Sequence, residues 1–158
     1  MNNQIELDNP LWQFACYFYQ FGDNKTILLA LQEAGYSVNL VICLIWLQQN
    51  KKSVDLDLIA ILESISLKHY LAPFRDIRKK IKAHPQVKSL YEDFLRLELN
   101  LEQNELALYY AEVDKRRNIV EPDQTELETL SLYRSFLQDT HAHTQVLLKK
   151  LVGYKKAR

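Results

Sequence analysis

The apolar stretch at residues 40–47, LVICLIWL, decides the fold of this chain. It lies inside a predicted helix over residues 38–49, and Ser37 is placed to cap the start of that helix. A helix that is apolar on every face has to be covered on every side, so we expect it at the centre of the molecule. The stretch also holds three β-branched residues, Val41, Ile42 and Ile45. A buried strand is therefore the alternative, because a short apolar run does not separate helix from strand by its periodicity.

The composition of the whole chain favours helices packed on helices. Its 158 residues include only 3 glycines and 4 prolines. All-β sandwiches and barrels need many turns built from these two residue types, so the scarcity argues against them. The length corresponds to one domain. We expect an all-α protein whose residues 1–158 form a single helical domain.

Capping and stop residues divide the first half of the chain into helices. Asn9 and Pro10 are typical of a helix start, and Gly35 is typical of a helix end. Pro73 is expected to break or kink a helix near Leu71. The predicted helices cover about residues 10–21, 25–34, 38–49, 55–71 and 73–83, and residues 1–84 are expected to form a compact bundle.

The second half of the chain is expected to form one long antiparallel hairpin over residues 85–158. A helix over 86–115 carries a seam with spacings of three and four residues, in which Asn104 is the polar member. Asp123 and Glu126 resemble a capping box that opens a second helix, which runs to about residue 152. These two helices are expected to pair within one chain or between two chains, so a homodimer stays open.

Charge is balanced overall but unevenly distributed. Twenty basic and twenty acidic side chains give no formal net charge, which counts against non-specific nucleic-acid binding driven by overall charge. Residues 51–90 carry nine basic and four acidic side chains, whereas residues 91–130 carry four basic and eleven acidic side chains. Blocks of opposite sign are able to pair inside a compact fold.

The strongest local signal is a one-sided group of cations on the predicted helix 73–83. At about 100° per residue, four basic side chains fall within one arc of about 100° beside an apolar edge. The four are Arg75, Arg78, Lys79 and Lys82. Such a face is able to bind an anion or an acidic partner, and the arginines offer the better fork for a carboxylate. The alternative is a solvated face that pairs with the acidic segment 92–128.

A second candidate site is a cleft between helices. Tyr17, Asn39 and His69, together with Arg75, are the residue types that line small-molecule sites in helical proteins. The polar residues 139–144 form another candidate, in which Asp139 or Glu98 orients a histidine as a general base. A solvated helix face is the alternative interpretation of residues 139–144.

Several kinds of chemistry are not supported by any motif. The glycines at 22, 35 and 153 supply neither a dinucleotide-binding fingerprint nor a phosphate loop. The four histidines lack the spacing of a helical zinc site or of a di-iron bundle. We therefore predict no cofactor, no metal site and no catalytic residue. Cys16 and Cys43 lie in apolar stretches and are read as buried thiols in a reducing compartment.

The chain is expected to be soluble and cytoplasmic. Its amino terminus lacks the basic and small-residue features of a secretory signal. The longest uninterrupted apolar run has eight residues, whereas a membrane span needs about twenty.

Three segments together resemble a family of short, uncharacterised proteobacterial proteins of unknown function. They are Asn9-Pro10-Leu11-Trp12, the segment from Ser37-Val38-Asn39 into Leu44-Ile45-Trp46-Leu47, and Leu71-Ala72-Pro73-Phe74-Arg75 with Arg78. The resemblance covers about residues 8–110. It implies an all-helical cytoplasmic protein and carries no activity, cofactor or catalytic residue with it.

These observations lead to three functional hypotheses. The first is a non-enzymatic binding or adaptor module that holds an acidic protein on the cationic face at residues 75–82, or in a groove between the first and fourth helices. The second is a small-molecule-binding protein or enzyme with a site in a helical cleft. The third is an RNA or ribosome contact through the basic face and tail, against which the neutral total charge counts.

Overall fold

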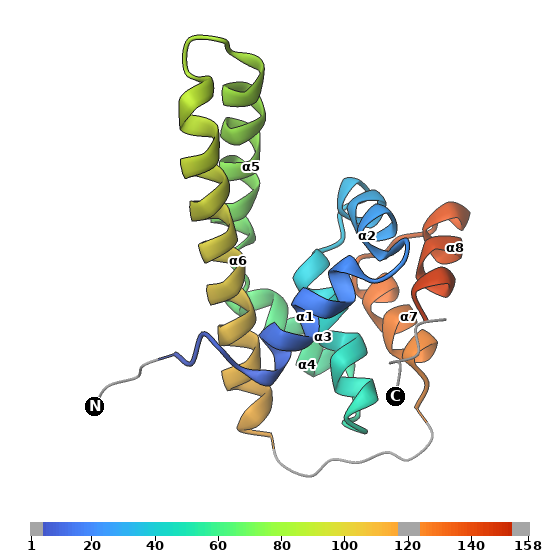
Figure 1. Cartoon of the computed structure of the whole chain (residues 1–158). Helices are drawn as coiled ribbons and strands as arrows, with labels where there is room; N and C mark the ends of the chain where they lie inside the picture. The colour runs from blue at the N-terminus through green and yellow to red at the C-terminus, as the bar shows by residue number, and fades with distance from the viewer. Residues whose placement is uncertain (1–4, 117–123, 153–158) are drawn as a thin grey trace.

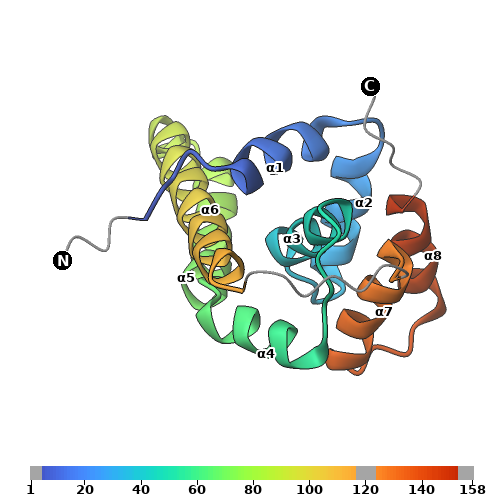
Figure 2. The same cartoon turned by 90° about the horizontal axis from the view of Figure 1, so that it is seen from below.

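The computed structural model describes residues 5–116 and 124–152, and all regular structure within them is helical. The central element is α3 (Val38–Gln49), in which every residue from Asn39 to Leu47 is buried. Seen from below in Figure 2, α3 lies in the middle with α1, α2, α4, α6 and α7 around it. The prediction of a buried central helix is confirmed, and the alternative of a strand is wrong.

The first helices begin and end where local capping residues place them. Before α1 (Pro10–Gln20), the Asn9 side chain accepts a hydrogen bond of 2.9 Å from the backbone N–H of Trp12. Before α3, the Ser37 hydroxyl accepts a hydrogen bond from the N–H of Leu40. After α2 (Asn24–Glu33), Gly35 has a φ of +96°, a left-handed conformation that glycine adopts without strain.

The chain leaves the helical path between α4 (Leu56–Ile65) and α5 (Lys68–Ala83), several residues before the predicted break. Pro73 lies inside α5 and does not end a helix. The break lies at Ser66 and Leu67 because the buried Glu105 carboxylate accepts hydrogen bonds from the Ser66 hydroxyl and the Leu67 N–H. A long-range contact therefore decides this boundary.

The long hairpin is formed by α5 and α6 (Tyr91–Asp114), joined through the short 3₁₀ helix η1 (Lys88–Leu90). The predicted hairpin between residues 86–115 and 123–152 is not present. In Figure 1 the α5–α6 pair projects from the bundle, and we call this pair the arm. Of the residues in the predicted seam of α6, Phe94 packs against Phe74 of α5, whereas Leu97 is 49% exposed and Glu98 and Glu105, outside that seam, are buried.

The last helical region is divided into α7 (Glu126–Phe136) and α8 (Ala142–Leu151). Gln138 has a φ of +55°, which turns the chain so that α8 folds back onto α2 while α7 packs on α3 and α4. The expected continuous helix to residue 152 is therefore wrong. The capping box consists of Thr125 and Glu128, and the predicted Asp123 lies outside the described residues.

One continuous hydrophobic core joins most of these helices. Buried apolar side chains from α1, α2, α3, α4, α6, α7 and α8 belong to a single cluster. No residue of α5 belongs to this cluster, although its Leu71 is buried. The arm is therefore attached to the bundle through the lower part of α6 and the start of α5.

Candidate functional site

The two predicted anion-binding arginines lie in the seam of the arm. Arg75 Nε is 3.4 Å from Glu98 Oε1, and Arg75 Nη2 is 3.1 Å from Glu102 Oε1. Arg78 Nε donates to the second oxygen of Glu98. Both arginine side chains are only 19% exposed. The guanidinium groups are thus engaged by glutamates of the acidic segment 92–128, as the alternative interpretation of the cationic face proposes.

These ion pairs are partly sheltered from water. Glu98 is 6% exposed and is shared by the two arginines. Burial raises the pKa of the neighbouring Glu102, and the hydrogen bond from Arg75 offsets part of that rise. The sequence already contained a pattern that suits this pairing. Arg75 and Arg78 are three residues apart, and the glutamates that face them on α6 are four residues apart.

The two predicted lysines lie at the surface of the arm. Lys79 Nζ is 3.9 Å from a carboxylate oxygen of Glu33 on α2, which is a loose contact. Lys82 Nζ lies 5.5 Å from the centre of the Tyr91 ring, within reach of a cation–π interaction. Both lysines are exposed, so their ammonium groups are accessible to a partner.

Exposed leucines continue from Tyr91 along α6 beside these lysines. Leu95 and Leu99 follow Tyr91 at intervals of four residues, and residues four apart lie on one side of a helix. Leu95 is 38% exposed and Leu99 is 50% exposed. We call this surface the inner face of the arm, and it consists of Lys79, Lys82, Tyr91, Leu95 and Leu99.

The predicted cleft residues are not brought together. Tyr17 on α1 and His69 on α5 are exposed. Asn39 on α3 is buried, and its side-chain amide donates to Glu105 Oε1 at 2.9 Å. In addition, α3 lies between α1 and α4 in Figure 2, so the first and fourth helices do not face each other directly.

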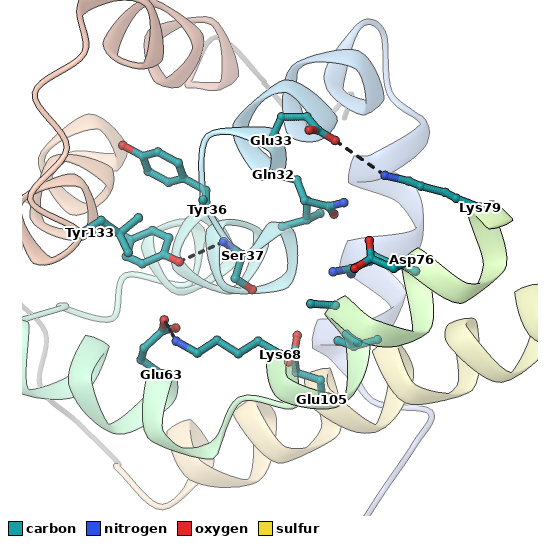
Figure 3. Close-up of a pocket in the computed structure, with 16 residues that line it drawn as sticks. Gln32, Glu33, Tyr36, Ser37, Glu63, Lys68, Asp76, Lys79, Glu105 and Tyr133 are labelled. Carbon is teal, nitrogen blue, oxygen red and sulfur yellow. Dashed lines mark hydrogen bonds and ion pairs between the residues drawn. The ribbon is translucent and has the colours of Figure 1, made fainter.

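A different cleft of about 380 Å³ opens between α2, α5 and α7. Figure 3 shows Lys68 reaching across it to Glu63, with Glu105 at one end and Tyr133 at the other. Glu63 Oε2 is buried and has no hydrogen-bond partner among the described residues. Of the predicted residues, Arg75 and Lys79 line this cleft. Sequence reasoning missed Glu63, Glu105 and Tyr133, which come together only through the tertiary fold.

The polar residues after α7 form a network around Asp139. This carboxylate accepts hydrogen bonds from the Tyr36 hydroxyl at 2.5 Å, from the Thr144 hydroxyl, and from the His141 N–H at 2.9 Å. Burial acts to raise the pKa of Asp139, but the hydrogen bonds from Thr144 and Tyr36 outweigh it and lower the pKa. Of the two carboxylates predicted to orient a histidine, Asp139 lies 2.9 Å from His141 Nδ1, whereas Glu98 is paired with the two arginines of the arm. The network joins α8 to the loop before α3.

Two further properties concern the described ranges, 5–116 and 124–152. They contain no group of three or more His, Cys, Asp or Glu side chains placed to hold a metal ion. Every helix in them is too short or too polar to cross a lipid bilayer. Cys43 is a buried free thiol, whereas Cys16, expected to be buried, is an exposed one.

Comparison with known proteins gives one match. No curated protein and no solved structure matches the chain. The resemblance to a family of uncharacterised proteins over about residues 8–110 is confirmed by the family match. Residues 10–109 match the family described as protein of unknown function (DUF2390), and the chain belongs to this family.

Proposed function

We propose that this chain is a non-enzymatic, cytoplasmic bacterial protein that binds an acidic protein partner through the inner face of its arm. The observation that carries the proposal is the combination, on a projecting hairpin, of exposed lysines with exposed leucines. Apolar patches rimmed by charged groups are typical of protein-binding surfaces. The lysines select a partner of negative charge, and the leucines supply apolar area.

The internal ion pairs of the arm support this role. Glu98 and Glu102 form ion pairs with Arg75 and Arg78 in the seam, and these ion pairs hold α5 and α6 together beneath the inner face. A clamped hairpin presents its surface with little loss of conformational entropy on binding. The arginines act as supports, and Lys79 and Lys82 remain to meet the partner.

The experiment places a photo-crosslinking amino acid at Leu95 in the full chain, in its native cells. A parallel experiment places the same amino acid at Val146 on α8, which is 51% exposed and serves as the control position. We expect Leu95 to capture an acidic protein that Val146 does not capture. The captured protein is then purified and its affinity for the chain is measured at low and high salt, where screening is expected to weaken binding.

Charge-reversal variants test whether the inner face is the surface that binds the acidic partner. Lys79→Glu with Lys82→Glu is expected to weaken binding at least about tenfold, or about 1.4 kcal/mol. Lys149→Glu with Lys150→Glu makes the same charge change on exposed positions of α8 and is expected to have little effect. Equal affinities for the two double variants contradict the proposal, and so does capture of RNA alone. Arg75 and Arg78 are unsuited to this test because reversing them disrupts the arm itself.

The cleft supports a second candidate function, the binding of a small polar molecule. Its volume is in the range of small-molecule sites, and the ion pair of Glu63 and Lys68 supplies charged groups to its lining. A thermal-shift screen with polar metabolites tests this candidate. A hit whose stabilisation is lost in Glu63→Gln and kept in Glu92→Gln supports it, and a screen without such a hit counts against it.

A further inference from the structure

The arm carries a second apolar surface on its other side. Four large side chains are exposed there, at 67% for Tyr70, 44% for Ile77, 44% for Leu90 and 49% for Leu97. Tyr70 and Ile77 are seven residues apart on α5, which is about two helical turns. Leu90, the last residue of η1, and Leu97 on α6 have the same spacing. We call these four residues the outer face.

The outer face points away from the bundle. Ile77 is two residues from both Arg75 and Lys79, which line the cleft toward α2, and two residues correspond to about 200° around a helix. Leu97 is likewise two residues from Leu95 and Leu99. Leu99 lies seven residues before Leu106, which is buried in the bundle, so this side of α6 faces the bundle and Leu97 faces away from it.

The two helices contribute to the same outward surface. Phe74 and Phe94 meet in the seam with ring centres 5.3 Å apart. The Arg75–Glu102 and Arg78–Glu98 pairs lie on one side of this aromatic contact. The two arginines follow Phe74 by one and four positions, and the two glutamates follow Phe94 by four and eight. These steps turn all four side chains to the same side of the arm. Ile77 and Leu97 each follow their phenylalanine by three positions and turn to the opposite side. The arm is therefore apolar on its solvent side, where an ordinary surface helix is polar.

We propose that the outer face binds the outer face of a second copy of this chain, with a two-fold axis that runs along the arm. In this arrangement α5 of each copy lies against α6 of the other, and the four helices form an antiparallel bundle. The seven-residue spacing on both helices suits such packing, because it keeps the apolar side chains in one seam.

Charge at the rim of the outer face is self-complementary, and this favours a second copy over a different partner. Lys80 flanks Ile77 on α5 and has no ion-pair partner among the described residues. Asp93 flanks Leu97 on α6, and among the described residues its one ion-pair partner is the exposed Arg96, at 2.9 Å. With the two-fold axis along the arm, Lys80 of each copy faces Asp93 of the other, so one contact of opposite charge forms twice.

The dimer is independent of the proposed function because it uses the opposite side of the arm. Light scattering after size-exclusion chromatography of the full chain tests it over about 1 to 100 µM protein. We expect the mass to rise with concentration from 18.6 kDa toward twice that value. A mass of one chain throughout this range overturns the proposal.

Matched variants identify the face that is used. Ile77→Asp with Leu97→Asp is expected to raise the dissociation constant more than about tenfold. Leu95→Asp with Leu99→Asp places the same charges on the inner face and is expected to leave the dimer intact, with circular dichroism showing that all variants remain helical. Loss of the dimer only in the inner-face variant overturns the assignment, as does equal dimerisation of the two variants.

A charge exchange tests the predicted arrangement of the two copies. Lys80→Glu and Asp93→Lys are each expected to weaken the dimer, because each brings two like charges together twice. The double variant with both changes restores opposite charges at the same places and is expected to recover the dimer. Failure of the double variant to recover it, while both single variants weaken it, overturns the proposed two-fold arrangement.

Discussion

Glu98 and Glu105 lie seven residues apart on the same side of α6, and both carboxylates are almost completely buried. Buried carboxylates are costly unless donors surround them. Glu98 is surrounded by two guanidinium groups, and Glu105 by the amide of Asn39, the hydroxyl of Ser66 and the N–H of Leu67. The two residues explain how a charged side of α6 is able to face the interior.

Replacing Glu98 is expected to destabilise the protein. Glu98→Gln removes the negative charge and leaves Arg75 and Arg78 facing each other in a sheltered seam. We expect the free energy of unfolding in urea to fall by about 2–4 kcal/mol. Glu92→Gln, at an exposed position of the same helix, is the control and should change it by less than about 0.5 kcal/mol. Similar values for the two variants would show that the ion pairs contribute little.

Asp139 is expected to give the protein a specific sensitivity to acid. Its pKa is lowered in the folded state, so it contributes stability above the unfolded pKa, near 3.9, and loses that contribution as the pH falls through the folded value. Asp139→Asn should therefore be less stable than the original chain at pH 7. The difference should shrink as unfolding in urea is repeated at pH 4, 3 and 2. A difference that is constant with pH contradicts this role.

At the scale of the elements, local signals predicted some boundaries and failed at others. The starts of α1 and α3 agree with prediction because the Asn9 and Ser37 side chains bond to N–H groups within their own first turn. The end of α4 was mispredicted because Glu105, 39 positions from Ser66, takes the polar groups there. Pro73 does not break the helix as predicted. The loss of one helical hydrogen bond at a proline is tolerated where packing holds the neighbouring turns.

The junction between α4 and α5 is expected to depend on Glu105. Glu105→Gln replaces one of the two accepting oxygens by an NH2 donor, which then faces either the amide of Asn39 or the hydroxyl of Ser66 and the N–H of Leu67. We expect a loss of about 2–3 kcal/mol in the free energy of unfolding, because buried donors are then left without acceptors. Faster amide exchange at Leu67 should accompany it. Gln103→Glu, the reverse change at a neighbouring position of α6, is the comparison. An equal loss in the free energy of unfolding for Gln103→Glu would show that the junction does not depend specifically on Glu105.

At the scale of the whole molecule, the bundle and the arm have different sources of stability. The bundle is closed around α3 by one continuous apolar cluster. The arm is held by the Phe74–Phe94 contact and by ion pairs, and much of its apolar surface remains exposed. Segments with few buried apolar contacts open more readily than the core of the same protein.

Hydrogen exchange should therefore distinguish the arm from the core. We expect amides over residues 76–97 to exchange through partial opening, faster than those over residues 40–47, which should exchange only on global unfolding. Mass spectrometry of peptides from the full chain measures both rates. Dilution into the monomer range should increase exchange in the arm if the outer face is covered by a second copy. Equal protection of arm and core contradicts this division.

The sequence by itself determined the helical class, the central position of residues 40–47 and the first capping sites. Each of these follows from composition or from contacts within a few residues, which the order of side chains already contains. The tertiary structure alone decided that α5 pairs with α6, that Glu98 and Glu102 are the glutamates that meet Arg75 and Arg78, and that α8 folds back onto α2. These outcomes depend on which donor reaches which acceptor across long separations in the chain, and periodicity within one helix carries no information about a partner on another.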